Sequence, residues 1–196
     1  MRKSDSRIVL TEENPFAPCH LERITFRFPS GVDWETLLDR MAAQQWCASI
    51  VGGNGSGKTT LLDQIVPHIE ARGFQPAIFR LATESSMRDK DRLADKLRDV
   101  RAPGFIILDG AEQLSTRQWL PVRAAASQAA GFLVSVHRTS RLPVVLELET
   151  SPKLLDALVE SLTGGKLPEG EGEVIFHRHR GNLRDCLREL HDRWCG

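Results

Sequence analysis

Short apolar runs alternate along the chain with longer segments in which apolar residues recur at helical spacing. The runs resemble strands that are covered on both faces of a parallel sheet, and they span residues 47–51, 77–81, 105–108, 132–136 and 144–148. The longer segments predict helices over residues 58–71, 86–100, 116–130 and 152–162. This order predicts an α/β fold in which a five-stranded, mostly parallel sheet has helices on both faces.

The region before the first predicted strand, residues 1–45, is less regular. A candidate edge strand spans residues 24–28. Asp33 is placed to cap a following helix whose apolar residues share one face. We therefore expect an N-terminal extension that packs on the core.

The region after the last predicted core helix begins with a stretch rich in Gly, Glu and Pro, residues 163–173, which predicts a surface linker. A helical segment follows over residues 174–194, with Asn182 and Asp185 placed as a capping pair. The expected division is a single domain with an N-terminal extension (1–45), a core (46–162), and a linker with a short C-terminal helical segment (163–196).

Composition and charge narrow the classes of function. The chain has 196 residues, with 26 basic and 26 acidic side chains and a formal net charge of zero, so nucleic acid is not indicated as a partner. The longest uncharged stretch, residues 124–137, is too short to span a bilayer, and no targeting segment is visible. The four cysteines form no CxxC or zinc-finger spacing and are interpreted as reduced thiols. These features predict a cytoplasmic protein without a membrane partner.

The clearest motif directly follows the first predicted strand and fits G-x-x-x-x-G-K-[ST], the Walker A or P-loop pattern. Glycines let the backbone curl so that successive N–H groups point at phosphate oxygens. Lys58 would supply a cation for the β- and γ-phosphates, and the Thr59 hydroxyl would coordinate Mg²⁺. The predicted phosphate-binding residues are Gly52, Gly53, Asn54, Gly55, Ser56, Gly57, Lys58, Thr59 and Thr60. The motif predicts a three-layer P-loop NTPase fold.

The second half of such a site requires a carboxylate at the end of another buried strand. Asp109 directly follows the predicted strand 105–108, so it would lie at the carboxyl edge of the sheet, where nucleotide and metal bind. We interpret Asp109 as the Walker B aspartate, which would hold Mg²⁺ together with Thr59.

An attacking water must also be oriented and deprotonated. The chain lacks the adjacent Asp-Glu pair of many ATPases, and Glu112, three residues beyond Asp109, is the nearest candidate base. Gln113 is an alternative residue for positioning the water. The alternative interpretation of Glu112 is a solvated residue that opens the next helix.

The end of predicted strand 132–136 is the expected place for a polar sensor of the γ-phosphate. Ser135, His137 and Arg138 are the candidates. His137 comes first because it can donate a hydrogen bond to phosphate in either of two charge states.

A basic segment near the end of the chain contains Gly181-Asn-Leu-Arg184, which resembles the G-x-x-R second sensor of AAA+ ATPases. This resemblance implies that Arg184 contacts the nucleotide. The segment after the sheet is, however, much shorter than the usual helical lid of that family.

With these motifs, residues 46–162 resemble a P-loop NTPase of the additional-strand group, which contains the AAA+, STAND and ABC ATPases. ABC transport is disfavoured because the chain has no LSGGQ-like signature and the gap from Lys58 to Asp109 has no room for the subdomain that carries it. The whole chain, including Asn14-Pro-Phe16 and residues 178–184, resembles a family of short, uncharacterised bacterial ATPase-like proteins. This second resemblance implies nucleotide binding but does not identify a biological pathway.

The expected function is Mg²⁺-dependent binding and hydrolysis of a nucleoside triphosphate. This function is compatible with a protein partner, which the sequence does not identify. ATP is favoured over GTP because the chain has no N/T-K-x-D guanine motif. One alternative is a P-loop kinase of a small molecule, with Arg178 or Arg180 as lid arginines. Another is a nucleotide-dependent binding switch with little turnover. The order of the strands distinguishes the ATPase from the kinase. The ATPase requires the strand that ends before His137 to lie between the strand before the P-loop and the strand that ends at Asp109.

Overall fold

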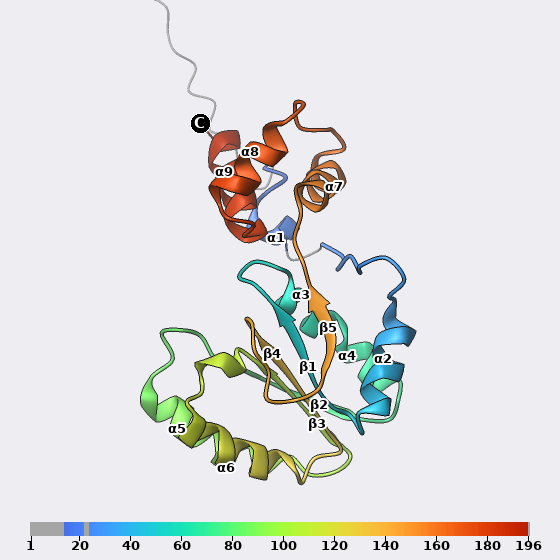
Figure 1. Cartoon of the computed structure of the whole chain (residues 1–196), viewed down its shortest axis with the longest axis vertical. Helices are drawn as coiled ribbons and strands as arrows, with labels where there is room; N and C mark the ends of the chain where they lie inside the picture. Colours follow the sequence, from blue (N-terminus) through green and yellow to red (C-terminus); the bar gives the residue numbers. More distant parts are fainter. Residues whose placement is uncertain (1–13, 22–23, 196) are drawn as a thin grey trace, which may run out of the picture. The chain divides into compact units, whose positions relative to one another are not determined.

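A parallel sheet forms the centre of the larger part of the molecule (Figure 1). The computed structural model describes residues 14–21 and 24–195, and within them the sheet has five strands in the order β2-β3-β4-β1-β5. The strands are β1 (Cys47–Gly52), β2 (Gln75–Arg80), β3 (Gly104–Asp109), β4 (Gly131–Val136) and β5 (Val144–Leu148). Every strand pair is parallel. This order places β4 between β1 and β3, as we expected for the ATPase and not for the kinase.

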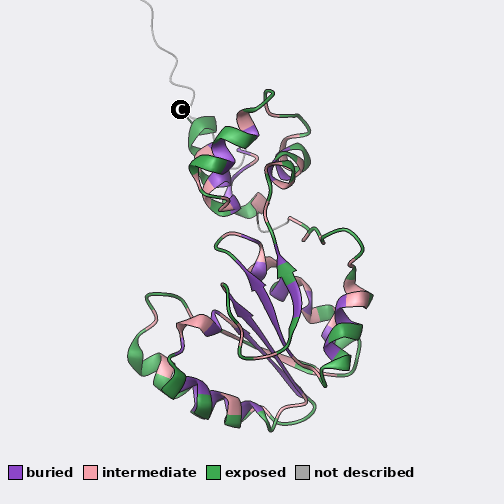
Figure 2. Ribbon diagram, viewed as in Figure 1, coloured by how far each residue is buried: buried purple, intermediate pink, exposed green. Residues whose placement is uncertain are grey.

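The three inner strands are buried almost throughout, which explains their continuous apolar runs. Figure 2 shows the buried residues concentrated along these strands. Neighbouring residues of one strand face opposite layers: Ile107 packs into a cluster with helices α2, α3 and α4, whereas Ile106 packs into a cluster with α5 and α6. The three-layer α/β prediction is confirmed.

The helices of this sheet unit begin and end close to their predicted positions. They are α2 (Trp34–Ala43), α3 (Lys58–Gln64), α4 (Val66–Glu70), α5 (Met87–Leu97) and α6 (Thr116–Ala126), with a 3₁₀ helix η2 (Ala111–Gln113) after β3. Asp33 caps α2 as expected, accepting a hydrogen bond from the backbone N–H of Thr36. The helix predicted over residues 58–71 is divided at Ile65 into α3 and α4, and Pro67 lies at the start of the second helix.

The candidate edge strand over residues 24–28 is wrong, since this segment pairs with no strand among the described residues. It is held by side chains instead. The Phe26 backbone N–H donates to Oε1 of Gln64 at 2.8 Å, and the Phe28 ring packs edge-on against Phe26 and Trp34. The alternating apolar pattern therefore reflects aromatic residues that lie over the core beside α3.

A second compact unit is helical. It contains α1 (Pro18–Leu21), α7 (Pro152–Thr163), α8 (Glu171–Arg178) and α9 (Leu183–Cys195), together with the loop tip Asn54–Ser56. Its apolar residues form a cluster of their own, which includes Phe16, Leu155, Ile175, Phe176 and Leu187. No helix among the described residues has the length and apolar character needed to cross a membrane.

This grouping differs from the expected division of the chain. We expected residues 152–162 in the core with the sheet, and residues 163–196 as a linker with a short helical segment. The apolar face of α7 instead packs with α8 and α9, so the boundary falls between Glu149 and Thr150. The expected extension 1–45 is also divided, because its described residues up to Ile24 belong to the helical unit.

Asn14 explains why the start of the described chain packs into the helical unit. Its side chain is fully buried, and its amide nitrogen donates to the carbonyl oxygen of His191 at 3.1 Å. Its amide oxygen accepts the backbone N–H of Phe16 at 2.9 Å, which places the Phe16 ring in the cluster. Asn14-Pro-Phe16 is therefore an anchor for the N-terminal segment on α9.

Candidate nucleotide-binding site

The P-loop lies where the motif predicts it, between the end of β1 and the start of α3. Gly55 and Gly57 have φ values of +70° and +91°, a left-handed backbone that glycine adopts without steric cost. The Phe26 ring lies against Gly57, where an added Cβ would come within 3.4 Å of it. Gly55 and Gly57 are thus required by the path of the loop.

The tip of this loop, Asn54–Ser56, belongs to the helical unit. A Cβ on Gly55 would lie 1.8 Å from Oδ1 of Asn182 and 3.0 Å from the backbone nitrogen of Arg184. The structure therefore brings the G-N-L-R segment that sequence analysis singled out to the P-loop tip. Asn182 acts there as the expected cap, since Oδ1 also accepts the backbone N–H of Arg184 at 3.1 Å.

Lys58 is almost completely buried and folds back over its own loop. Its Nζ donates to the carbonyl oxygens of Gly52 and Gly53 at 2.6 and 2.8 Å. The ammonium group therefore lies inside the curl of the loop. Ser56 contributes a buried hydroxyl that has no hydrogen-bond partner within the described part of the chain.

The end of β3 carries the predicted carboxylate, and Thr59 reaches it from α3. The Thr59 hydroxyl donates to Oδ2 of Asp109 at 2.7 Å. These are hard oxygen ligands of the kind that Mg²⁺ prefers, usually with water and phosphate oxygens completing its shell. The described residues hold no cluster of three or more His, Cys, Asp or Glu side chains arranged around a metal position. The fit to Mg²⁺ thus rests on the converging Thr59 and Asp109 oxygens.

Glu112 and His137 are brought into direct contact. Glu112 lies on η2, one turn beyond Asp109, and its Oε1 lies 2.8 Å from Nε2 of His137 at the end of β4. The second oxygen, Oε2, is buried and has no hydrogen-bond partner among the described residues. Glu112 also lines a cavity of about 280 Å³ with Trp119. The candidate base and the candidate sensor are therefore paired with each other.

The other sensor candidates lie in different surroundings. Arg138 is exposed in the loop after β4. Ser135 is fully buried, donates to Oδ1 of Asp109 and accepts the backbone N–H of Gly110 at 3.0 Å. Ser135 was expected only as a candidate sensor of the γ-phosphate, and its link to Asp109 was missed because it depends on the pairing of β3 with β4.

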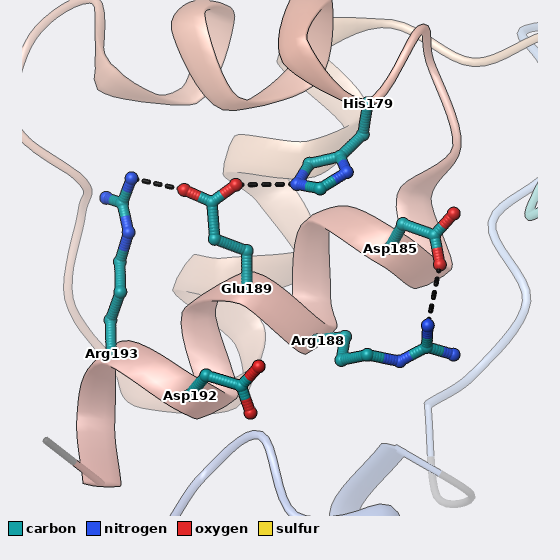
Figure 3. A pocket seen from close by; sticks show the side chains of 6 residues that line it. All are labelled: His179, Asp185, Arg188, Glu189, Asp192 and Arg193. Atoms are coloured by element: carbon teal, nitrogen blue, oxygen red, sulfur yellow. Dashed lines mark hydrogen bonds and ion pairs between the residues drawn. The ribbon is translucent and has the colours of Figure 1, made fainter.

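The helical unit carries a charged depression of about 630 Å³. Figure 3 shows that Glu189 lies between His179 and Arg193 and that Asp185 pairs with Arg188. Burial acts to raise the pKa of Glu189, but the hydrogen bond from His179 and the nearby arginine charges outweigh it, and the net pKa is lowered. These charges neutralise one another.

Arg178, one of the two arginines of the kinase alternative, also pairs with Glu189 in this network. Arg180 lies at the turn after α8 with a φ of +53°.

Comparison with known proteins gives the fold. No protein-family model and no curated protein matches the chain. Among solved structures, a variant of RuvB from Thermotoga maritima is 19% identical with a TM-score of 0.56, covering 80% of this chain and 58% of RuvB. The replication initiator DnaA, bound to AMPPCP and single-stranded DNA, is 13% identical with a TM-score of 0.57, covering 87% of this chain and 62% of its own. AMPPCP-bound DnaA from Aquifex aeolicus is 14% identical with a TM-score of 0.54, covering 82% and 61%.

The chain thus spans about three fifths of the length of these structures. At these identities the similarity shows the fold alone, which is the α/β fold that the chain shares with RuvB and DnaA. The resemblance inferred from the motifs is confirmed at the level of the fold.

Proposed function

We propose that the protein binds ATP with Mg²⁺ and hydrolyses it. The observation that carries this proposal is the 2.7 Å hydrogen bond between Thr59 and Asp109, which joins the start of the P-loop helix to the end of β3. A P-loop alone indicates phosphate binding. A P-loop joined to a strand-end carboxylate supports a nucleotide site that also takes a metal.

Each group has a distinct task in this site. The loop amides and the Lys58 ammonium would hold the β- and γ-phosphates through charge-assisted hydrogen bonds. Thr59 and Asp109 would hold Mg²⁺, which when bound neutralises negative charge on the phosphates. Glu112 would accept a proton from the attacking water.

ATP is the proposed nucleotide for two reasons. The chain lacks the guanine-binding tetrapeptide. Two of the similar solved structures are of DnaA with AMPPCP, an ATP analogue. A role for Arg184 at the nucleotide is proposed from the G-x-x-R resemblance of residues 181–184, and it would appear as unequal weakening of ATP and ADP binding in Arg184→Ala.

A nucleotide-dependent switch with little turnover is the second candidate, and one observation favours it. Oε1 of Glu112 is paired with His137 and Oε2 is buried, so the carboxylate is already engaged as the side chain lies. A base held in this way would act only after it is released, for example by a partner protein. The kinase alternative is disfavoured by the position of β4 between β1 and β3.

Phosphate release measured with ATP and with GTP, in Mg²⁺ and after chelation, tests the proposal. We expect ATP-dependent release that stops on chelation and in Asp109→Asn. Asp95→Asn is the matched control, because Asp95 is an exposed carboxylate on α5, and it should keep the parental rate. Tight Mg²⁺–ATP binding without release would support the switch. No Mg²⁺-dependent binding of either nucleotide would refute both candidates.

A further inference from the structure

Ser135 is a polar residue in the middle of the sheet, on a strand that is otherwise apolar. The residue is fully buried, and its neighbours on β4 are buried as well. A buried hydroxyl requires hydrogen-bond partners, and Ser135 uses both of its functions: it donates to Oδ1 of Asp109 and accepts from the backbone N–H of Gly110 at 3.0 Å.

The two bonds act on the part of the chain that links the metal-holding carboxylate to the candidate base. Because Ser135 engages Oδ1 of Asp109, the opposite oxygen, Oδ2, is turned toward Thr59. Gly110 begins the turn that leads to Glu112 on η2. Its φ is +85°, and a Cβ there would lie 2.2 Å from the carbonyl oxygen of Leu81, so this turn has little freedom to take another path.

Removal of the hydroxyl would leave the partly buried Oδ1 of Asp109 and the buried N–H of Gly110 without their partner. A buried N–H that loses its partner does not regain it from water, so the Gly110 turn and the Asp109 carboxylate next to it would have to shift. A shift of Asp109 would alter metal binding first, since Oδ2 is the oxygen that meets Thr59.

We propose that Ser135 is the positioning residue of the metal site: its hydroxyl fixes the Asp109 carboxylate and the Gly110 turn so that the site takes Mg²⁺ with the nucleotide. This proposal rests on the proposed function, because it assumes that Asp109 holds Mg²⁺. In this role Ser135 acts through Asp109, to which its hydroxyl donates. Residues that orient a metal ligand typically change metal affinity by about 10- to 100-fold when they are removed.

The test is the Mg²⁺ concentration that half-saturates ATP binding, measured by titration calorimetry in Ser135→Ala and in Ser49→Ala. Ser49 is a matched control, since it is also fully buried, lies on the adjacent strand β1, and donates to carbonyl oxygens of Leu142 and Pro143 at 3.3 and 3.1 Å. We expect Ser135→Ala to require on the order of tenfold more Mg²⁺ or above. Its binding of ATP without Mg²⁺ should stay within about twofold of the parent. Ser49→Ala should show the parental Mg²⁺ requirement even where its thermal stability falls.

Ser135→Cys keeps the size of the side chain but bonds weakly, so it tests the proposal if the alanine variant does not fold. It should need more Mg²⁺ than the parent. A parental Mg²⁺ requirement in a folded Ser135→Ala or Ser135→Cys variant would overturn the positioning role while leaving the proposed function intact. A parent whose ATP binding is independent of Mg²⁺ would overturn the proposed metal site, and this role with it.

Discussion

Replacing Glu112 by glutamine removes the candidate base while keeping its shape. Asp109 has both oxygens engaged, by Thr59 and by Ser135, so the proton from the attacking water must go to another group. Glu112 lies one turn away on η2. A positioned general base contributes about 10²- to 10⁴-fold to a rate. At about 1.36 kcal/mol for each factor of ten, the loss corresponds to roughly 2.7 to 5.4 kcal/mol of transition-state stabilisation.

The assay is single-turnover hydrolysis of ATP in Mg²⁺, with ATP binding measured in parallel by calorimetry. Glu112→Gln should lower the hydrolysis rate on the scale given above and leave ATP affinity within about threefold, because Glu112 makes no proposed contact with the ground-state phosphates. Hydrolysis at the parental rate by Glu112→Gln would refute the assignment and leave Glu112 as a residue that only opens η2.

His137→Ala distinguishes the hydrolase from the switch, because it removes the partner of Glu112. If the 2.8 Å contact orients Glu112 for catalysis, removal of His137 should lower the hydrolysis rate without changing ADP affinity. If the contact restrains Glu112, as the switch requires, removal of His137 should raise the rate. The sign of this change therefore decides between them.

Two further predictions concern the helical unit. Gly55→Ala places a Cβ against Oδ1 of Asn182 at a left-handed φ, so ATP affinity measured by calorimetry should fall at least about tenfold. Gly165→Ala is the control, because its Cβ would meet only one atom within 4 Å, and it should bind ATP as the parent does. Equal ATP affinities for both variants would contradict the contact between Gly55 and Asn182. Glu189 has a pKa held below its ordinary value of 4.5, so its ionised form stabilises the fold above that pH and the stabilisation is lost as the pH falls through the lowered pKa. Glu189→Gln should therefore lower the melting temperature at neutral pH by an amount that shrinks as the pH falls below 4.5, and a constant deficit would contradict this.

Much of the sheet could be predicted from the sequence because its causes are local. A strand that is buried on both faces must be apolar at nearly every position, and β3 and β4 follow that rule. The P-loop could be located because glycine spacing and Lys58 are imposed by the chemistry of phosphate binding. The assignment of Asp109 as the metal-holding carboxylate followed from the rule that ligands bind at the carboxyl ends of parallel strands. The position of β4 between β1 and β3 then followed from the class of fold.

The helical unit could not be predicted in the same way. The apolar stripe of α7 shows that one face is buried but does not name the surface that covers it, which in the structure is formed by α8 and α9. The segment over residues 24–28 has the alternation of a strand, yet its aromatic rings and a hydrogen bond to Gln64 hold it without a strand partner. The same hydrophobic pattern is compatible with more than one structure wherever tertiary packing decides which one forms.

The contacts inside the site were also beyond the sequence. The pairing of Glu112 with His137 and of Ser135 with Asp109 joins residues 25 and 26 positions apart, and it exists because β3 and β4 are neighbours in the sheet. From the sequence, His137 and Glu112 were expected to have separate tasks, His137 at the phosphate and Glu112 at the water. Their contact instead presents them as one unit, and this is the reason that a switch remains a candidate.

The measurement that tests the central claim most directly is a calorimetric titration of ATP in Mg²⁺ into the parent and into Lys58→Ala. Lys58 lies inside the P-loop with its ammonium on the carbonyls of Gly52 and Gly53, so phosphate binding should depend on it. We expect the parent to bind ATP and a folded Lys58→Ala variant to bind it at least about tenfold more weakly, a loss on the order of 1.4 kcal/mol. Unchanged ATP affinity in the folded variant would contradict the assignment of this loop as the nucleotide site.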